Sequence, residues 1–479
     1  MPLILPGNVG SATAATGYNV ANSCMFNDGD SAYMHRTPSA GNRRTMTLSV
    51  WIKGSSLADG SNNVLGQYNS SNENNAMLLV IEGAGKIMVW NYTTDAYTMD
   101  IRTNRLLRDN SSWYHIVVAV DTTQATASNR VKVYVNGVQE TSLAVASYPA
   151  ENLELFLNQG VAQNIGTQRY GSTVGSPFDG YMAEFCFIDG TQNAVTDFGE
   201  FDEDSKIWKP IDVSGLTFGT NGYYLDFEDS SALGNDVSGN DNDFTTVNLA
   251  ATDQSTDTCT NNFCTWNILD SFYSSATFSE GNTTVVTPNA SLTYATGTVG
   301  LSSGRWYFEV QPFDPSDNNN IGIVDHVSTS NSSSAGELQF QPRGWCYRQV
   351  GDVYNNNSSV SGSWAAYSAG VTIGVFVDLE DNKIYWSRNG AMQNSGTGVT
   401  ITAAASTDTG FYFPAVGDYV TNDDTTFRTN FGGVSSFAIS SGVTDDNGYG
   451  TFEYTPSVTV DSTAKKFYAI CTKNLAEYG

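Results

Sequence analysis

The stretch that most constrains the fold of this 479-residue chain spans residues 372–390. Residues 373–377 form a short apolar run rich in β-branched side chains, which is typical of a buried strand. Residues 378–382 are polar, and residues 383–388 can form a second strand. Asn389-Gly390 then supplies the positive φ angles that a type I′ turn requires. The stretch therefore predicts a β-hairpin followed by a tight turn.

The same order of elements occurs earlier in the chain. Residues 115–121 form an apolar run that ends in Asp121, and after a polar loop residues 131–137 alternate and end in Asn136-Gly137. In the later copy, alternation places Ile384 and Trp386 on one face of the strand and Tyr385 on the other. Two copies of one hairpin pattern predict two β-sandwich modules.

Composition agrees with a chain built from strands and turns. Glycine is frequent, with 45 residues, and only 15% of the residues are charged. This mixture favours β-structure with many turns, and no stretch keeps the 3.6-residue apolar period of a helix. The expected fold class is all-β, with two antiparallel β-sandwich (jelly-roll) domains joined by an irregular acidic connector. The expected ranges are 1–16 (arm), 17–190, 191–274 (connector) and 275–479.

The charge balance excludes two classes of partner. The formal net charge is -27, and no basic stripe interrupts the acidic background. A nucleic-acid-binding surface needs such a stripe, and an anionic membrane repels a chain of this charge. Residues 1–7 lack the positive region of a signal peptide, and no apolar stretch reaches membrane-spanning length. Synthesis in a cytoplasm without signal-directed export is expected.

Cysteine, histidine and acidic residues give weak indications of bridges or metals. Six cysteines are scattered, of which Cys259 and Cys264 could bridge locally or remain free thiols. Three ungrouped histidines give no zinc signature, and His115 in its apolar strand is interpreted as structural. Asp28 and Asp30 are calcium candidates or, alternatively, part of a plain acidic turn. No other cofactor is expected.

The N-terminal arm carries an isolated apolar segment. Leu3, Ile4 and Leu5 lie between two prolines, outside either module. We interpret them as a peg that anchors the chain on another protein, and a disordered tail is the alternative.

Motifs in residues 17–190 appear in a characteristic order. They are Phe26-x-Asp-Gly-x-x-x-Tyr33, Ser49-x-Trp-Ile-Lys53, Trp113-Tyr-His-Ile-Val117, Val131-x-Val-Tyr-Val-Asn-Gly137 and Phe178-Asp-Gly-Tyr-Met-Ala-Glu184. This part of the chain resembles the laminin-G-like, concanavalin-A-like jelly roll. The resemblance also implies that a calcium ion can accompany the fold.

Motifs in residues 275–474 resemble a second family. They are Gly304-x-Trp-Tyr-Phe-Glu-Val310, the hairpin of residues 372–390, Phe411-Tyr-Phe-Pro-Ala-Val416 and Asn430-Phe-Gly432. Their order and spacing resemble the SPRY (B30.2) β-sandwich, whose members bind through loops at one end. The aromatic residues expected on such loops, and hence as ligand contacts, are Trp345, Tyr347, Trp364 and Tyr367, with Tyr354 beside them. The alternative is that part of this set belongs to the core.

The acidic segment 200–204 is the best enzymatic candidate. On a strand, Glu200, Asp202 and Asp204 would share one face, as the paired carboxylates of a glycosidase must. Only Phe201 is apolar between them, and the segment lies outside both modules. A solvated acidic connector is the favoured interpretation, and we expect no enzymatic activity.

The whole arrangement resembles structural proteins of tailed, notably marine, bacteriophages. That resemblance implies a virion-surface protein, such as a capsid decoration, fibre or tail adhesin, that forms homo-oligomers. Its implied partners are other virion proteins and a host-surface glycan. A free carbohydrate-binding adhesion protein is the first alternative, and a glycan depolymerase is the second.

Overall fold

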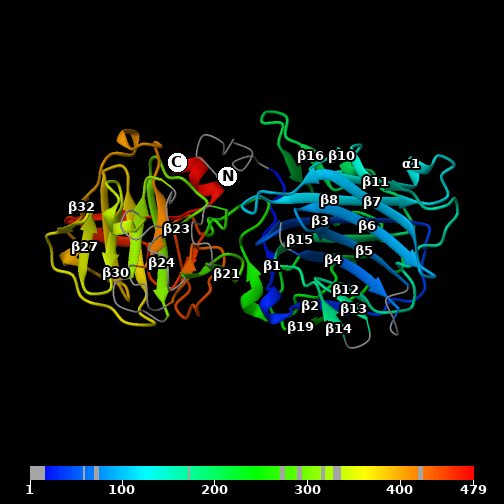
Figure 1. The fold of residues 1–479 in the computed structure, drawn as a ribbon, viewed down its shortest axis with the longest axis horizontal. Helices are drawn as coiled ribbons and strands as arrows, with labels where there is room; N and C mark the ends of the chain where they lie inside the picture. Colours follow the sequence, from blue (N-terminus) through cyan, green and yellow to red (C-terminus); the bar gives the residue numbers. More distant parts are fainter. Residues whose placement is uncertain are drawn as a thin grey trace. The chain divides into compact units, whose positions relative to one another are not determined.

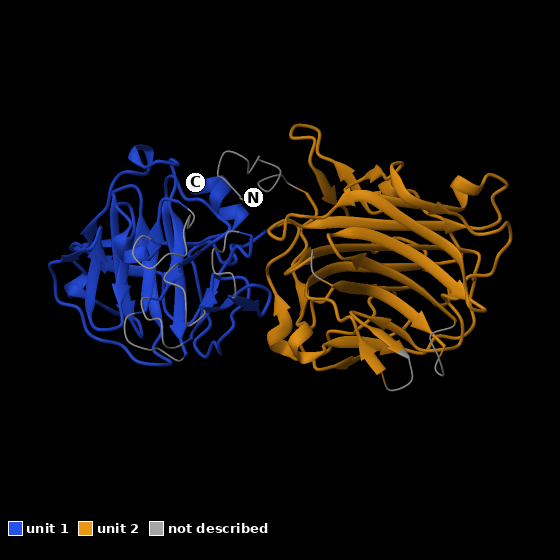
Figure 2. Cartoon of the chain, viewed as in Figure 1, with its two compact units in different colours: residues 1–14, 261–479 blue, residues 15–260 orange. Residues whose placement is uncertain are grey.

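The computed structural model describes residues 17–57, 60–69, 75–170, 173–269, 276–287, 294–313, 319–326, 336–418 and 424–479. The described chain divides into two compact units between residues 260 and 261, coloured separately in Figure 2. Strands dominate both units (Figure 1), and the α-helices of the described part are α1 (Ala127–Arg130) and α2 (Thr472–Tyr478). The all-β prediction is confirmed. Within these residues, neither helix has the length and apolar character needed to cross a bilayer.

We call residues 17–260 the first unit (orange, unit 2 in the key of Figure 2) and residues 261–479 the second unit (blue, unit 1 in the key). The first unit is a sandwich of two antiparallel sheets. One sheet, called the front sheet here, has the order β11 (Leu143–Ser147), β7 (Ala96–Leu106), β6 (Lys86–Thr93), β5 (Asn75–Glu82), β4 (Ser61–Tyr68), β12 (Gln163–Ile165), β2 (Tyr33–Arg36) and β19 (Thr245–Val247). The back sheet has the order β10 (Val138–Gln139), β9 (Val131–Val135), β8 (Tyr114–Asp121), β3 (Thr45–Gly54), β15 (Gly180–Asp189), β1 (Ser23–Phe26) and β20 (Gln254–Ser255), and β18 (Tyr223–Leu225) also pairs with β15.

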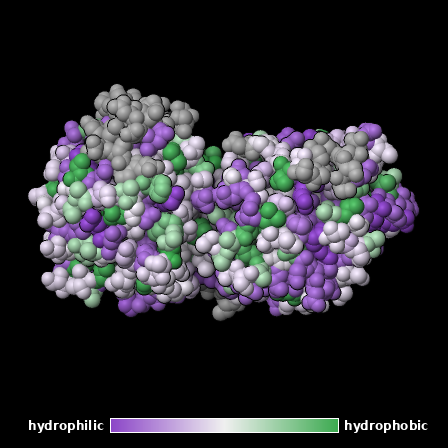
Figure 3. All heavy atoms as spheres, turned by 90° about the horizontal axis from the view of Figure 1, so that it is seen from below, coloured by the Kyte–Doolittle hydropathy of each residue, from purple (hydrophilic) through white to green (hydrophobic). Residues whose placement is uncertain are grey.

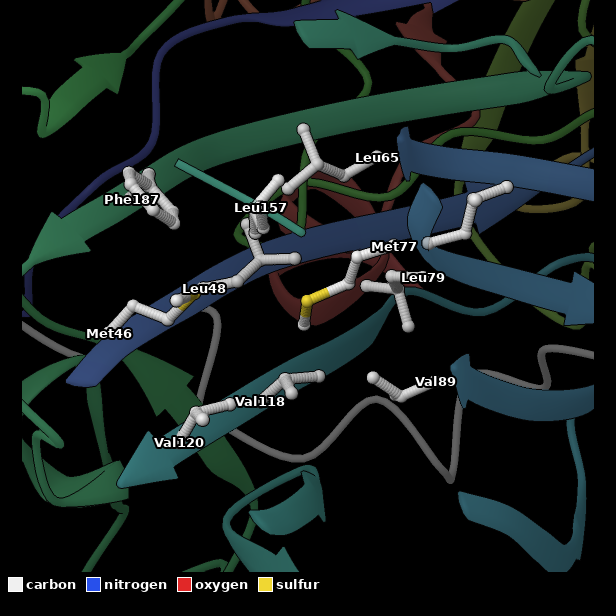
Figure 4. Close-up of a pocket in the computed structure, with 11 residues that line it drawn as sticks. Met46, Leu48, Leu65, Met77, Leu79, Val89, Val118, Val120, Leu157 and Phe187 are labelled. Atoms are coloured by element: carbon white, nitrogen blue, oxygen red, sulfur yellow. The ribbon is translucent and has the colours of Figure 1, made fainter. Parts of the chain in front are cut away.

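The core of this unit lies between the two sheets. Met46, Leu48, Val50 and Ile52, the residues that alternate along β3, all point into it. Figure 4 shows side chains of the front sheet meeting those of the back sheet around a small cavity of ≈ 20 Å³. Because its lining is entirely apolar and it is scarcely larger than one water molecule, the cavity should stay dry.

The predicted connector differs most from the structure. Its strands β18, β19 and β20 pair with β15, β2 and β1, so residues 191–260 extend both sheets of the first sandwich. Lys53 on β3 forms a 2.7 Å ion pair with Asp257, and both side chains are 1% exposed. Trp113 donates its indole N–H to the same carboxylate at 3.0 Å. A buried cation is thus neutralised by a residue that follows the jelly-roll motifs.

A hairpin of this segment covers the outer surface of the back sheet. Strands β16 (Gly199–Phe201) and β17 (Trp208–Pro210) pair, and Trp208 stacks over His115 of β8. The Trp208 indole donates to His115 Nδ1 at 2.9 Å, and Ser49 Oγ lies 2.8 Å from Nε2. Burial lowers the pKa of His115 to about 3, so the ring is neutral and structural, as expected.

The second unit contains two further antiparallel sheets. One has the order β21 (Thr277–Ser279), β22 (Thr284–Thr287), β34 (Thr425–Asn430), β24 (Arg305–Pro312), β29 (Ile373–Asp378), β30 (Lys383–Arg388) and β31 (Ala391–Met392). On it, β32 (Val399–Thr400) pairs with β30, and β39 (Tyr468–Ala469) runs parallel to β24. The other has the order β23 (Tyr294–Thr296), β33 (Phe413–Gly417), β25 (Asn320–Val324), β26 (Trp345–Arg348), β27 (Asp352–Asn355) and β28 (Ser358–Val360).

The hairpin predicted at residues 372–390 is present: β30 has the expected bounds, and β29 extends one residue further than expected, to Asp378. Asn389 and Gly390 have φ of 46° and 76°, and Arg388 faces Ala391 across this two-residue turn. Beneath the preceding turn, Asp378 is fully buried and pairs with Lys465 at 2.8 Å and with Arg305 at 3.1 Å. The hairpin is therefore fixed by its turn residues and by two cations from other strands.

Shorter elements complete the two units. Residues 261–269, predicted as connector, belong to the second unit, where Trp266 is buried in the core. The remaining two-stranded ribbons are β13 (Gln168–Tyr170) with β14 (Thr173–Gly175), β35 (Val443–Thr444) with β36 (Thr451–Phe452), and β37 (Ser457–Val460) with β38 (Thr463–Lys466). All six cysteines are free thiols, Cys259 and Cys264 included. The anchoring residues Leu3, Ile4 and Leu5 lie outside the described residues.

The ion pair between Lys53 and Asp257 gives a first test. Asp257→Ala leaves a buried ammonium group without its counter-charge, which should lower the free energy of unfolding by about 3–5 kcal/mol. The control is Arg44→Ala, which breaks a 3.2 Å pair with Glu154 whose partners are 45% and 52% exposed. That loss should cost about 1 kcal/mol or less. Urea unfolding of both variants measures the difference, and equal small losses would show that residue 257 is not part of the fold.

Candidate functional site

The aromatic residues predicted as SPRY loop contacts lie mainly inside the second unit. Trp345 and Tyr347 are on β26 and are 5% and 0% exposed, and Tyr367 is 4% exposed. Tyr347 contacts Tyr367 edge to face with ring centroids 5.1 Å apart. The expectation that these three rings are exposed on loops is wrong, because they fill the space between the two sheets of the second sandwich.

Trp364 keeps an exposed part but also packs against this core. Its ring contacts Tyr347 at 6.0 Å and Trp386 at 5.8 Å. Tyr354 is half-buried, with the Arg348 guanidinium 4.2 Å above its ring. Each ring is therefore only partly available for a stacking contact.

The acidic segment 200–204 runs from the end of β16 into the turn that precedes β17. Asp202 accepts hydrogen bonds from the Ser205 backbone N–H and the Ser205 hydroxyl, each at 2.9 Å. Lys209 lies 3.3 Å from both Asp202 and Glu200. The Ser205 backbone donor, followed by the Ser205 hydroxyl, lowers the pKa of Asp202 to about 2. A glycosidase acid needs a raised pKa, so this arrangement does not provide one.

Three buried glutamates, Glu184, Glu309 and Glu337, have raised pKa values but are enclosed by the protein. Burial raises the pKa of Glu184 and of Glu309 from 4.5 to about 7. Tyr224 donates its hydroxyl to Glu184 at 2.8 Å, and Glu309 accepts from Tyr307 at 2.9 Å and from the Tyr454 backbone at 2.7 Å. The carboxyls of Glu184 and Glu309 are surrounded by protein donors, which indicates a structural role.

The calcium candidates Asp28 and Asp30 lie in an exposed one-turn 3₁₀ segment. The Asn27 side chain accepts from the Gly29 backbone at 3.0 Å and so organises the turn. In the part of the chain that the structure describes, no group of three or more His, Cys, Asp or Glu side chains is placed to hold a metal ion. Calcium therefore gains no support from this geometry.

A different aromatic cluster lies on the outer surface of the front sheet in the first unit. Along β5 and β6, Met77, Leu79, Ile81, Ile87 and Val89 point into the core. Alternation therefore directs Leu78, Val80, Trp90 and Tyr92 to the opposite surface. Tyr68 of β4 and Tyr97 of β7 lie beside Trp90 there. We call Tyr68, Trp90, Tyr92 and Tyr97 the aromatic face.

The rings of the aromatic face meet edge to face. Tyr97 contacts Trp90 at 5.8 Å and 85° and Tyr92 at 5.0 Å and 74°. Tyr68 is buried beneath Trp90, whereas Trp90 and Tyr92 are half-buried and Tyr97 is 51% exposed. The exposed rings thus form a corner that is held by their mutual contacts. This preorganisation limits the side-chain entropy that a ligand would have to remove.

Charged groups adjoin the aromatic face on the same surface. Asp100 faces Trp90 across the β6–β7 pair. Arg102 donates from Nε to Asp100 at 2.9 Å and from a terminal nitrogen to Glu82 at 3.2 Å. The combination offers rings for stacking and fixed polar groups for hydrogen bonds, which is the usual composition of a small-molecule site.

Sequence reasoning missed this site, although a signal was present. Residues 86–93 are apolar or aromatic on both faces of the strand, with Trp90 and Tyr92 two residues apart. A strand with two apolar faces needs a cover on each side or leaves one exposed. Among the described residues, the other exposed large hydrophobic ones are Val138, Val174, Phe201, Ile207, Val237, Leu269, Phe313 and Val350. On the face drawn in Figure 3, hydrophobic residues lie dispersed among hydrophilic ones.

Family models match one region in each unit. Residues 27–194 match the concanavalin A-like lectin/glucanases superfamily, in the Laminin_G_3 model, and residues 305–433 match the SPRY domain. Comparison with curated proteins gives no match.

Solved structures with similar folds match parts of the chain at low identity. The SPRY domain of human HERC1 is 16% identical over 32% of this chain and 91% of its own, with a TM-score of 0.26. A heptameric SAP-like pentraxin from Limulus polyphemus is 11% identical over 37% and 80%, with a TM-score of 0.29. The Ruminococcus gnavus IT-sialidase CBM40 bound to alpha2,3 sialyllactose is 16% identical over 34% and 91%, with a TM-score of 0.25. The chain thus contains a concanavalin A-like domain followed by a SPRY domain.

The raised pKa of Glu184 predicts a pH dependence of stability. Its pKa is 4.5 in a free side chain and about 7 in the folded protein. The folded state therefore binds the proton more tightly than the unfolded state does. This binding stabilises the folded protein fully below pH 4.5, and the stabilisation is lost as the pH rises through 7. From about pH 5 to about pH 8, the stability of Glu184→Gln should rise relative to the parent by about 2–3 kcal/mol.

Urea unfolding across this pH range measures the effect. The side-chain amide introduced by Glu184→Gln keeps a carbonyl oxygen that can accept from Tyr18 and Tyr224, so the hydrogen bonds need not be lost. The matched control is Glu203→Gln, an exposed glutamate in the β16–β17 turn, which should show no such trend. Parallel pH profiles for the parent and Glu184→Gln would contradict the interpretation.

Proposed function

We propose that this chain is a non-enzymatic glycan-binding protein whose aromatic face contacts the sugar. The observation that carries the proposal is the corner formed by Trp90, Tyr92 and Tyr97 on an outer sheet surface. The apolar face of a sugar ring can pack on such aromatic rings, while its hydroxyls hydrogen-bond to neighbouring polar groups. Asp100, Glu82 and Arg102 are the polar groups beside these rings.

The absence of enzymatic activity is part of the proposal. Its support is the state of the strongest candidate carboxylates: Asp202 has a lowered pKa within a turn, and Glu184 and Glu309 are enclosed by protein donors. A depolymerase would need two carboxyls on either side of a bound glycosidic bond. A reducing-end assay on any polysaccharide that binds should therefore give no product.

The proposed setting is the surface of a bacteriophage particle. Its support is the order of a concanavalin A-like domain and a SPRY domain, which resembles that of phage structural proteins. In this setting the chain contacts other virion proteins and uses the aromatic face for a host-surface glycan.

Substitution at the most exposed ring tests glycan binding. Tyr97→Ala removes half-exposed aromatic area, so binding should weaken by roughly 1–3 kcal/mol, or about 5- to 150-fold, if the ring is an interface anchor. Its effect on folding should stay within about 0.5 kcal/mol, as for most exposed positions. A polysaccharide array followed by titration calorimetry on the best-binding sample measures the first quantity, and thermal melting measures the second.

The matched control is Phe201→Ala. Phe201 is 47% exposed in the same unit but packs on Trp208 over the back sheet, away from the aromatic face. It should bind like the parent. Equal affinities of parent and Tyr97→Ala, or no binding to any array sample, would refute the proposed site.

Mass spectrometry of purified particles tests the setting. Particles from an infected culture that produces this chain should contain it, and deletion of residues 2–12 should remove it from particles if Leu3, Ile4 and Leu5 anchor it. Folding of the deleted chain is checked by its melting temperature. A chain found only in the soluble fraction would leave a free adhesion protein as the better description.

A further inference from the structure

A second pocket lies at the opposite end of the front sheet in the first unit. It has a volume of ≈ 680 Å³ and is formed by β2, β19 and two loops, with polar lining residues throughout: His35, Arg36, Thr37, Ser39, Thr220, Asn221, Asp241, Asn242, Asp243 and Thr245. The sheet order places five strand spacings between β7, which carries Tyr97, and β2. At about 4.8 Å per strand this is roughly 24 Å, so the pocket is separate from the exposed rings of the aromatic face, which lie on β6 and β7.

Arg36 forms a fixed group of donors in this pocket. Its guanidinium lies over the rings of Tyr223 and Phe244, 5.7 Å from each centroid. It donates to the Asn221 backbone carbonyl at 3.0 Å and to the Asn242 side-chain oxygen. These bonds use two of the five N–H groups of an arginine, so the side chain is oriented while donors remain for a ligand.

The two loops that line the pocket are braced by hydrogen bonds. Asn242 donates from its side chain to the backbone carbonyls of Thr220 at 3.0 Å and Gly222 at 2.8 Å. Asp236 accepts from the backbone N–H of Asn242 at 2.9 Å and of Tyr224 at 2.8 Å. The segment around residues 236–243, which resembles an irregular Asn/Asp-rich loop in the sequence, is therefore held in place and forms one side of the pocket.

The chemistry of the lining residues restricts which ligands can bind in the pocket. Asp241 and Asp243 are exposed acceptors, Arg36 is a donor, and the hydroxyls of Thr37, Ser39 and Thr245 can do either. Vicinal sugar hydroxyls also donate and accept, and so they match such a lining. The electrostatic surroundings of Arg36 include the carboxylates of Asp236 and Asp243. Among the lining residues, the carboxylates of Asp241 and Asp243 outnumber the guanidinium of Arg36, which disfavours a carboxylate-bearing sugar.

We propose that this pocket is a second sugar-binding site, which takes one neutral, hydroxyl-rich monosaccharide unit through direct hydrogen bonds to Arg36, Asp241 and Thr245. The proposal deepens the proposed glycan binding but does not depend on the aromatic face. One chain would then hold a glycan at two places, and effective concentration would make its binding of a long polymer tighter than that of either site alone.

Saturation-transfer NMR on the full chain tests the site. D-mannose, D-galactose and D-glucose are presented separately at about 1–10 mM, the range in which weak single-sugar binding is detectable. At least one should receive saturation, and D-glucuronate should receive none. The measurement is made in the Tyr97→Ala background, which removes the exposed ring of the aromatic face. The signal should persist there and should fall to the no-protein level when the double variant Asp241→Asn, Thr245→Val is added.

The substitutions are chosen to leave the fold intact. Asp241 has φ of 56°, which asparagine also tolerates, and Thr245 is an exposed strand residue whose shape valine keeps. Unchanged melting temperature verifies folding, and Glu203→Gln is the control for the loss of one exposed charge.

Three kinds of result overturn the proposal of the pocket site. Absence of transfer to every neutral sugar excludes the site. A signal that survives the double variant, or disappears in Tyr97→Ala, assigns binding elsewhere. Loss of the signal with EDTA and its return with calcium would make Asp241 and Asp243 a cation site instead. Monosaccharide binding without any array binding would refute the aromatic face alone.

Discussion

A strand that is apolar on both faces must be covered on both sides, and the first unit depends on how this requirement is met. On the back sheet, Val117, Cys186 and Ile188 point away from the sandwich core. They are covered by a set of residues that all follow the jelly-roll motifs, Phe198, Val213, Phe218 and Tyr224. On the front sheet, Tyr68, Leu78 and Val80 are buried beneath neighbouring side chains, but the rings above them remain partly exposed. The same physical requirement thus produces a closed surface on one sheet and a candidate binding surface on the other.

Each unit contains a buried ion pair that links strands to segments distant in the sequence. Lys53 and Asp257 close the first unit, and Asp378 with Lys465 and Arg305 closes the hairpin of the second. Breaking one partner of a buried pair costs more than the pair contributes, so such groups specify one arrangement of strands more than they add net stability. Although the net charge is -27, individual acidic residues such as Asp257 and Asp378 are buried and hold cations in the interior.

Most of the sandwich architecture is predictable from the sequence because long strands alternate clearly and tight turns have specific residues. The bounds of β30 and the turn at Asn389-Gly390 illustrate this. The connector was misassigned because β18, β19 and β20 are only two or three residues long and show no alternation to detect. The exposure of Tyr347 could not be predicted, because alternation shows which residues share a face but not which face is covered. The aromatic face was missed for the same reason, since both sides of β6 are apolar.

Hydroxyl-radical footprinting tests most directly whether the aromatic face is where a glycan binds. Mass spectrometry quantifies oxidation of individual tryptophan and tyrosine side chains with and without the best-binding polysaccharide. Our account predicts that oxidation of Tyr97 and Trp90 falls when the polysaccharide is present, while oxidation of the partly exposed Trp364 in the SPRY domain stays constant. Protection of Trp364 with unchanged oxidation of Tyr97 would contradict it and would return recognition to the second unit.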